Sequence, residues 1–394
     1  MRTPGYDLNE RPFMVIWETT RACDLACKHC RAESMPNPHP NALNTDEAKK
    51  LLSDVVAFGN PRPIFIFTGG DPFKREDLFE LIDYGQSKKM VMALSPSATP
   101  LLSYDNLKRA KESGVKAISL SLDGSTPELH DSFRGVNGSY DLTIRGWKYA
   151  RELGLKLQVN TTVTRYNLYD LPDLFRILHD LGAMTWSVFF LVPVGRGELG
   201  DEVSADDFEA VMHFLYDCSK YISVKTTEGH HYKRVVIERG ITDRLGKDPY
   251  ETYGLSDVYL KLKEGLLRHT QELQIKPRDV TKRLPLHINA GNGFIFISHL
   301  GDVYPSGFMP SKAGNVREQS LVEIYRESPL LKTLRNPAML RGRCGQCEFK
   351  MLCGGSRSRA YAVTNDPCAE EPYCTYVPGS FPYKEELGQA LSAH

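Results

Sequence analysis

The chain has 394 residues with 49 basic and 49 acidic side chains, so its formal net charge is zero. A balanced charge does not favour nucleic acid or an anionic membrane surface as a partner. Residues 1–9 are polar and lack the apolar core of a secretory signal, and the longest apolar stretch, residues 186–194, is too short to span a bilayer. These features predict a cytoplasmic protein that uses neither nucleic acid nor a membrane, and the length predicts more than one domain.

Strand and helix patterns alternate through the first half of the chain. Runs rich in β-branched and aromatic residues predict strands at residues 13–18, 63–67, 90–94, 117–122, 156–163 and 185–192. Helical spacing predicts helices at 44–58, 75–88, 104–113, 139–153, 171–181 and 204–222. This alternation is typical of parallel βαβ units and predicts an α/β partial barrel, (β/α)6, over residues 1–239. Ligands of such folds bind at the carboxyl ends of the strands.

The second half is less regular. Residues 240–285 are charged, and we interpret them as a linker or lid. Apolar runs at 293–298 and 303–304 flank Leu300-Gly301-Asp302 and predict a short hairpin, which a helix at 320–327 follows. Residues 286–394 are predicted to form a small cysteine-rich α+β domain.

Eight of the nine cysteines fall into two groups, which in a cytosolic chain indicates metal ligands rather than disulfides. The first group, Cys23, Cys27 and Cys30, has the spacing C-x3-C-x2-C. A closed structural zinc site needs four protein ligands, whereas three thiolates leave one position of a cluster open. Soft thiolates favour iron–sulfur chemistry, with a zinc loop or plain buried thiols as the alternatives.

This loop resembles the signature loop of the radical S-adenosylmethionine (SAM) enzymes, C-x3-C-x-aromatic-C, with His29 in the aromatic position. The resemblance implies a [4Fe–4S] cluster whose open iron binds SAM. It also implies cleavage of SAM to a 5′-deoxyadenosyl radical that abstracts a hydrogen atom from a substrate.

Other segments extend the resemblance to SAM binding. Gly69, Gly70, Asp71 and Pro72 stand where the family has Gly-Gly-Glu-Pro, a turn that approaches the amino end of SAM. Arg134 is a candidate for the SAM carboxylate, because a guanidinium can donate two parallel hydrogen bonds; a capping or surface arginine is the alternative. The remaining candidates, for which turn formation is the alternative role, are Ser95, Ser97, Ser121, Asp123, Asn160 and Thr162.

The second cysteine group resembles the auxiliary-cluster domain found after many radical SAM barrels, in its SPASM and shortened Twitch forms. Its likeness implies a second [4Fe–4S] cluster held by Cys344, Cys347, Cys353 and Cys374, with Cys368 as a competitor for the fourth place. Ser306 and Arg357 stand where the full form has further cysteines, which implies one auxiliary cluster rather than two. A zinc ribbon is the alternative.

The C-terminal segment, residues 353–362, resembles the radical SAM enzymes of alternative haem biosynthesis, which act on tetrapyrroles such as iron–coproporphyrin. Cations are expected over the barrel mouth to bind the carboxylates of such a substrate, although a solvated charged loop is an equal alternative. The candidates are Arg196, His230, His231, Lys233 and Arg234.

Two other functions stay open from the sequence. A radical SAM maturase of a ribosomally made peptide is one, but such enzymes usually carry an N-terminal peptide-recognition domain. A non-catalytic iron–sulfur electron carrier is the other, and the SAM-binding segments argue against it. For the enzyme, we expect a ferredoxin or flavodoxin as the electron donor.

Overall fold

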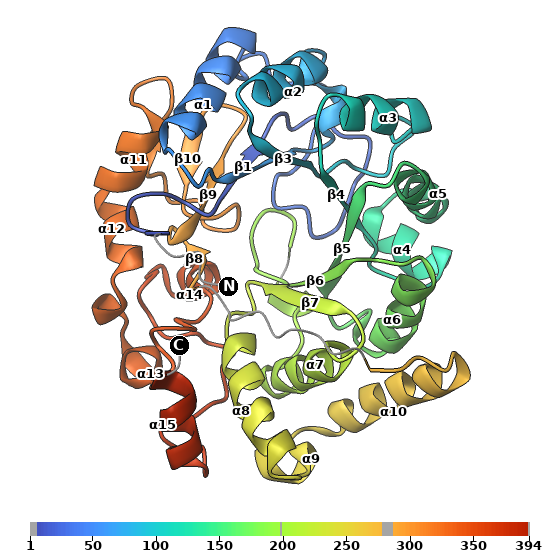
Figure 1. Ribbon diagram of the computed structural model, residues 1–394, viewed down its shortest axis with the longest axis vertical. Coiled ribbons are helices and arrows are strands. Elements are labelled where there is room, and N and C mark those ends of the chain that lie inside the picture. Colours follow the sequence, from blue (N-terminus) through green and yellow to red (C-terminus); the bar gives the residue numbers. More distant parts are fainter. Residues whose placement is uncertain (1–5, 198, 278–286, 393–394) are drawn as a thin grey trace.

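The computed structural model describes residues 6–197, 199–277 and 287–392, and its strands form one continuous sheet (Figure 1). The strand order is β11-β10-β9-β1-β2-β3-β4-β5-β6-β7, with β8 paired to β9. The barrel strands are β1 (Met14–Glu18), β2 (Ile64–Thr68), β3 (Val91–Leu94), β4 (Ala117–Ser121), β5 (Lys156–Val163), β6 (Thr185–Phe190) and β7 (Ser223–Thr227).

Each neighbouring pair from β1 to β7 is parallel. This arrangement confirms the α/β partial barrel that the sequence predicts, and the six predicted strands are all present. The structure adds β7, a strand that the sequence analysis did not predict, beside β6, with Thr185 opposite Ser223.

Helices surround the barrel strands on the outside (Figure 1). They are α1 (Thr45–Ala57), α2 (Leu78–Ser87), α3 (Tyr104–Glu112), α4 (Pro127–Arg134), α5 (Ser139–Glu152), α6 (Leu171–Asp180), α7 (Ala205–Cys218) and α8 (Tyr232–Arg244). The core lies between the two layers, because alternate strand residues such as Trp17 and Phe65 are fully buried and face the apolar sides of the helices. Helix α1 begins at a capping box in which Asn44 and Glu47 bond each other's backbone N–H groups.

The C-terminal part continues the barrel sheet rather than forming a separate one. Strand β9 (Gly293–Ile297) pairs in parallel with β1, with Met14 opposite Phe294. Strand β10 (Asp302–Tyr304) returns antiparallel to β9, which confirms the predicted hairpin. The other elements are β8 (Asn289–Ala290), β11 (Gly314–Asn315), α11 (Leu321–Glu327), α12 (Pro329–Arg335), α13 (Gly342–Gln346), α14 (Arg357–Thr364) and α15 (Lys384–Ser392).

The segment interpreted as a linker or lid contains two helices, α9 (Pro249–Tyr253) and α10 (Asp257–Glu272). Helix α10 packs along α6 and α7 on the outside of the barrel (Figure 1). The buried His269 on α10 lies 2.6 Å from Asp173 on α6, which fastens the two helices together. The end of the segment, residues 278–286, lies outside the described residues, so its boundaries stay a prediction.

None of the helices in the described residues combines the length and the apolar character that crossing a membrane requires.

Candidate radical SAM active site and auxiliary cluster site

The three cysteines of the first group lie in the loop that follows β1. Cys23 and Cys27 are each 8% exposed and form a small apolar cluster with Leu25, against which Cys30 packs. All three are free thiols. The three cysteines therefore pack in one small cluster that follows the carboxyl end of the first barrel strand.

Two other parts of the chain hold this loop in place. The end of α4 accepts hydrogen bonds from the loop, from Ala26 N to the Arg134 carbonyl at 3.1 Å and from Lys28 N to the Phe133 carbonyl at 3.0 Å. The segment after β6 contributes Arg196 N, which donates to the Cys30 carbonyl at 3.0 Å. Backbone hydrogen bonds from α4 and from the segment after β6 thus hold the cysteine loop in place.

Glycine is required where α4 meets the loop. Gly135 has a φ of +70°, and a Cβ there would lie 2.6 Å from the Ala26 carbonyl oxygen. Beside it, His29 stacks on Phe133 with ring centroids 4.4 Å apart and planes 7° from parallel. His29 therefore packs as the aromatic residue whose position it holds in the motif.

Polar groups surround the three sulfurs. Arg134 Nη1 donates to Cys27 Sγ at 3.6 Å, whereas the Cys23 thiol donates to Ser97 Oγ at 3.5 Å. Burial raises the pKa of the Cys30 thiol, but backbone N–H donors from Ser34 and Ala32 and the Arg196 guanidinium outweigh it, so the net pKa is lowered. Donors aimed at sulfur stabilise thiolates, so the residues present fit an iron–sulfur cluster.

The Gly69-Gly70-Asp71-Pro72 turn packs against the backbone that leads into the cysteine loop. Gly70 N donates to the Thr20 carbonyl at 2.8 Å, and Asp71 N donates to the Ala22 carbonyl at 2.6 Å. A Cβ on Gly69 would lie 2.5 Å from the Thr20 oxygen, so a side chain there would separate the two segments. The glycines thus allow the close approach that joins the turn to the loop.

Asp71 is fully buried behind this turn. Its carboxylate accepts a hydrogen bond from Phe73 N at 3.2 Å and one from Thr99 Oγ1 at 2.6 Å. Burial raises the pKa of Asp71 to about 6. Asp71 therefore caps the short helix that starts at Pro72 and fixes the shape of the turn.

The remaining candidates for SAM binding lie along the carboxyl ends of β3, β4 and β5. Asp123 accepts from Thr162 N at 2.7 Å and forms a buried ion pair with Arg134.

The serine candidates bond to neighbouring strands and turns. Ser97 Oγ donates to the Gly70 carbonyl, and Ser95 Oγ lies 2.6 Å from Ser119 Oγ. Ser121 stands opposite Asn160 in the β4–β5 pairing. The structure brings these residues together at one edge of the barrel, and Arg134 joins them to the cysteine loop.

Four cysteines of the second group line a single cavity. They are Cys344, Cys347, Cys353 and Cys374. Cys368 is not among the residues around this cavity, and its backbone is held instead by Asp366 and Arg341. The cavity therefore has the set of thiols that the sequence predicts as ligands.

Backbone donors approach two of these sulfurs. Gly355 N lies 3.3 Å from Cys353 Sγ, and Glu371 N lies 3.3 Å from Cys344 Sγ. Without a metal, burial raises the pKa of Cys347 and Cys353 to about 12. Four thiols around one cavity, two of them with backbone donors, are a donor set that fits an iron–sulfur cluster.

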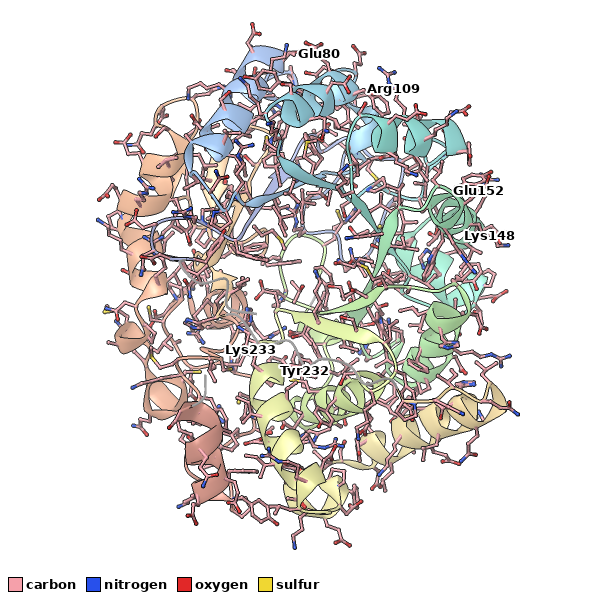
Figure 2. All side chains as sticks on the ribbon, viewed as in Figure 1. Glu80, Arg109, Lys148, Glu152, Tyr232 and Lys233 are labelled. Atoms are coloured by element: carbon pink, nitrogen blue, oxygen red, sulfur yellow. The ribbon has the colours of Figure 1, made fainter. Side chains whose placement is uncertain are left out.

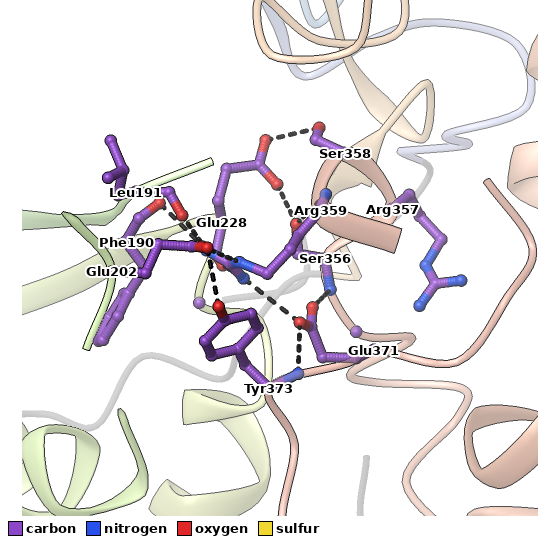
Figure 3. A network of polar contacts seen from close by, with 12 residues as sticks. Phe190, Leu191, Glu202, Glu228, Ser356, Arg357, Ser358, Arg359, Glu371 and Tyr373 are labelled. Atoms are coloured by element: carbon purple, nitrogen blue, oxygen red, sulfur yellow. Dashed lines mark hydrogen bonds and ion pairs between the residues drawn. The ribbon is translucent and has the colours of Figure 1, made fainter. Parts of the chain in front are cut away.

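The two positions where a second auxiliary cluster would need cysteines have other partners: Ser306 bonds Glu228, whose contacts with Ser356 and Ser358 are drawn in Figure 3, and Arg357 bonds backbone carbonyls. Ser306 Oγ donates to Glu228 Oε1 at 3.0 Å, and Ser358 Oγ donates to the same oxygen at 2.8 Å. Arg357 donates to the carbonyls of Pro367 and Ala369 at 3.0 and 2.6 Å. The bonds of Ser306 and Ser358 to Glu228 join the C-terminal domain to the loop after β7, whereas Arg357 bonds only within the C-terminal domain.

The candidate substrate cations do not gather in one place. Arg196 lies beside the cysteine loop, where its guanidinium donates to Ser34 Oγ at 3.1 Å. Lys233, in the first turn of α8, donates to the Ile288 carbonyl at 3.0 Å (Figure 2). Its neighbour His230 is half-buried, and burial and the charge of Lys233 lower the pKa of His230.

His231 and Arg234 lie instead around the auxiliary cavity. The Arg234 guanidinium is buried and donates to Glu209 and Glu238, each at 2.6 Å. Burial lowers the pKa of His231 to about 4, and the ring stacks on Phe208. These two side chains therefore line the auxiliary cavity, and their contact with a substrate stays a prediction.

The sequence analysis missed Lys225, which lies on β7. Its neighbour Val224 packs against the core under the helices, so the alternation of the strand turns Lys225 to the inner face of the barrel. The side chain reaches solvent, yet protein surrounds it closely enough that desolvation lowers the pKa of Lys225 to about 8. If β7 had been predicted, its alternation would have identified Lys225 as a candidate on the inner face of the barrel.

Comparison with known families agrees with this geometry. Residues 17–178 match the Radical SAM superfamily, and residues 289–348 match SPASM, an iron–sulfur cluster-binding domain. The chain belongs to the radical SAM superfamily and carries a SPASM domain. It is an enzyme rather than an electron carrier, and its cofactors are SAM and two [4Fe–4S] clusters.

Two curated relatives cover nearly the whole chain. The "AdoMet-dependent heme synthase" of Oleidesulfovibrio alaskensis is 39% identical over 94% of this chain and 88% of its own. The protein of the same name from Nitratidesulfovibrio vulgaris is 40% identical over 93% of this chain and 92% of its own. The crystal structure of Streptococcus suis SuiB bound to precursor peptide SuiA matches with a TM-score of 0.65 and 17% identity, over 93% of this chain and 76% of that one, so it supports the fold alone.

Proposed function

We propose that this enzyme modifies carboxylate side chains of a tetrapyrrole, by oxidative decarboxylation of the propionates of iron–coproporphyrin. The observation that carries the proposal is the identity of 39% and 40%, over nearly the full chain, to relatives named AdoMet-dependent heme synthases. Modification of a ribosomally made peptide is the alternative, and the peptide-bound structure that supports it is only 17% identical.

We infer that Cys23, Cys27 and Cys30 hold the SAM-binding cluster. Bound there, the reduced cluster and SAM supply a 5′-deoxyadenosyl radical that abstracts a hydrogen atom from the substrate. The chain's own residues position the cofactor. Contacts to SAM are proposed from the Gly69-to-Pro72 turn, from Ser95, Ser97 and Ser121, and from Asp123, Arg134, Asn160 and Thr162.

The proposed reaction balances as follows for each propionate. One hydrogen atom is removed from the propionate carbon next to the macrocycle. The carboxylate then leaves as CO2, one electron passes to a one-electron acceptor, and a carbon–carbon double bond forms. The side chain is thereby converted into a vinyl group.

Cations on the inner side of the barrel are proposed to bind the substrate carboxylates. Lys225 and Lys233 have no ion pair with a carboxylate among the described residues, and desolvation lowers the pKa of each to about 8. A partly desolvated cation without an anionic partner gains more from a bound carboxylate than a fully solvated one does. Arg196 and His230 complete this proposed set.

We propose that Cys344, Cys347, Cys353 and Cys374 hold the auxiliary cluster, with Cys374 rather than Cys368 as the fourth ligand. The support is that these four thiols line one cavity and that backbone donors approach two of the sulfurs.

An anaerobic titration tests the substrate. The fully reconstituted enzyme is titrated with iron–coproporphyrin, and we expect a shift of the Soret band at micromolar protein, followed by SAM-dependent conversion of propionate to vinyl groups in the mass spectrum. No Soret change and no new product would contradict the proposal. Consumption of a precursor peptide instead of iron–coproporphyrin would support the alternative function, modification of a ribosomally made peptide.

We further propose that a ferredoxin or flavodoxin reduces the enzyme and that it works in the cytoplasm. The support is indirect: all nine cysteines are free thiols, as in a reducing compartment. Replacement of dithionite by reduced flavodoxin should sustain SAM cleavage. SAM cleavage with dithionite but with neither ferredoxin nor flavodoxin would contradict the proposed electron donor.

A further inference from the structure

His231 lines the auxiliary cavity, and none of the contacts described above uses its ring nitrogens. Its side chain is 1% exposed, and both ring nitrogens are buried without a hydrogen-bond partner in the described part of the chain. The ring is stacked on Phe208, with centroids 5.4 Å apart and planes 23° from parallel. The stack fixes the plane of the His231 ring, although neither ring nitrogen makes a hydrogen bond to the described residues.

An imidazole always carries at least one N–H group, whichever tautomer it adopts. Buried donors in folded proteins are almost always paired, because an unpaired one loses its hydrogen bonds to water without replacement. His231 therefore needs an acceptor that the protein atoms alone do not supply.

The nearby carboxylates already have donors. Glu209 accepts from Arg234 through both oxygens and from His213 at 3.2 Å. Glu371 accepts from Ser356 N at 2.6 Å and from Tyr373 N at 3.2 Å. Both anions are charge neighbours of His231 without hydrogen-bonding it. The cavity that His231 lines is the place from which a further acceptor can come.

His231 lines this cavity together with Cys344, Cys347, Cys353 and Cys374. An iron–sulfur cluster bound there presents sulfide and thiolate sulfurs, which accept hydrogen bonds. We propose that His231 donates a hydrogen bond to a sulfur of the auxiliary cluster and thereby raises the reduction potential of that cluster. The inference rests on the proposed four-cysteine site and is independent of the substrate.

The physical reason is charge. Reduction adds an electron to the cluster, so a donor on sulfur stabilises the reduced form more than the oxidised form. His231 is a positioning residue in this role, because it acts on the potential and touches no reacting atom. A higher potential suits a centre that accepts an electron, in contrast to the SAM-binding cluster, which must donate one.

The first test is a redox titration of the reconstituted full-length enzyme, followed by electron paramagnetic resonance. His231→Phe keeps the stack on Phe208 but removes the N–H, and His231→Gln restores a donor. We expect the midpoint potential of the auxiliary cluster to fall in H231F and to return towards the wild-type value in H231Q. Iron content and the midpoint of the SAM-binding cluster should stay unchanged in both variants.

The titration has a control and two opposing outcomes. His179→Phe, on α6 and partly exposed, removes a histidine that is absent from the cavity lining and should leave both potentials unchanged. An unchanged auxiliary midpoint in H231F would overturn the inference. Loss of half of the iron in H231F would also overturn it, because His231 would then be a ligand.

A second measurement uses the wild-type enzyme, so it does not depend on the folding of a variant. With ring-15N histidine, the reduced auxiliary cluster should show the weak nitrogen coupling of a hydrogen-bonded imidazole in pulsed electron paramagnetic resonance. Absence of any coupling, or a strong coupling typical of nitrogen bound to iron, would contradict the assignment.

Discussion

Arg134 Nη1 lies 3.6 Å from Cys27 Sγ, while the same guanidinium forms a buried ion pair with Asp123. This contact couples a cysteine of the three-cysteine loop to the carboxyl end of β4, where the proposed SAM contacts lie. From the sequence, Arg134 is a candidate for the SAM carboxylate, with a capping or surface role as the alternative. In the structure its guanidinium is already engaged on two sides, so it also positions the loop.

Loss of Arg134 should destabilise the protein. Arg134→Met leaves the Asp123 carboxylate buried and unpaired, and we expect the free energy of unfolding to fall by about 3 kcal/mol in a urea titration. Adding Asp123→Asn to Arg134→Met should recover part of this loss. Arg145→Met, at an exposed position on α5, is the control and should change stability by less than about 0.5 kcal/mol. Equal stability of Arg134→Met and the control would contradict the buried pair.

The fourth ligand of the auxiliary cluster can be settled with two matched variants. Cys374→Ala should lose the auxiliary iron and retain the other half of the iron, whereas Cys368→Ala should keep all of it after anaerobic reconstitution. The reason is that Cys374 lines the cavity and Cys368 does not. Iron loss in Cys368→Ala alone would reverse the assignment.

Substrate binding should depend on pH through Lys225 and Lys233. Desolvation places the pKa of both ammonium groups at about 8 in the free enzyme, below the ordinary lysine value. Below that pH they are charged and attract carboxylates, and as the pH rises through about 8 they lose their protons. The affinity for iron–coproporphyrin should therefore fall between pH 7 and pH 9, by about tenfold if one charged contact of ~1.4 kcal/mol is lost.

The double variant Lys225→Met/Lys233→Met provides the comparison. It should bind more weakly at pH 7 and should show a smaller change of affinity with pH. An identical pH profile for the variant and the wild type would remove these lysines from the substrate site.

Arg359 joins the two halves of the molecule and is fully buried (Figure 3). It donates to the carbonyls of Leu191 and Glu228, each at 2.8 Å, and lies 3.3 Å from Glu202.

Arg359→Met should lower the free energy of unfolding by about 3 kcal/mol, because it leaves carbonyls and a carboxylate unpaired. Arg326→Met, which removes an exposed pair with Glu10, should cost less than about 1 kcal/mol. The free energy of unfolding is measured by calorimetry, and an equal loss in both variants would contradict a structural role for Arg359.

Local patterns were sufficient to predict the barrel. Strands such as Lys156–Val163 match the prediction because their burial alternates with the apolar residues. Strand β7 was missed because Ser223–Thr227 has one apolar residue in five and resembles a loop. The pairing of Met14 with Phe294 joins residues far apart in the chain, so no local pattern could have indicated it.

The site was predictable where the spacing itself carries the chemistry. Cys23, Cys27 and Cys30 are close in sequence, so a single loop brings them together. Cys368 and Cys374 could not be separated by spacing, because the choice depends on which thiol faces the cavity. His231 and Arg234 were expected at the barrel mouth, whereas the structure shows both of them lining the auxiliary cavity, which no local pattern could indicate.

The central claim is that the three-cysteine loop makes this chain a SAM-cleaving enzyme. The most direct measurement is the amount of 5′-deoxyadenosine formed by the reconstituted enzyme with SAM and dithionite under anaerobic conditions, compared with Cys27→Ala. We predict 5′-deoxyadenosine from the wild type and none from the variant, which should still contain the auxiliary iron. Equal amounts from both proteins, or none from the fully reconstituted wild type, would contradict the claim.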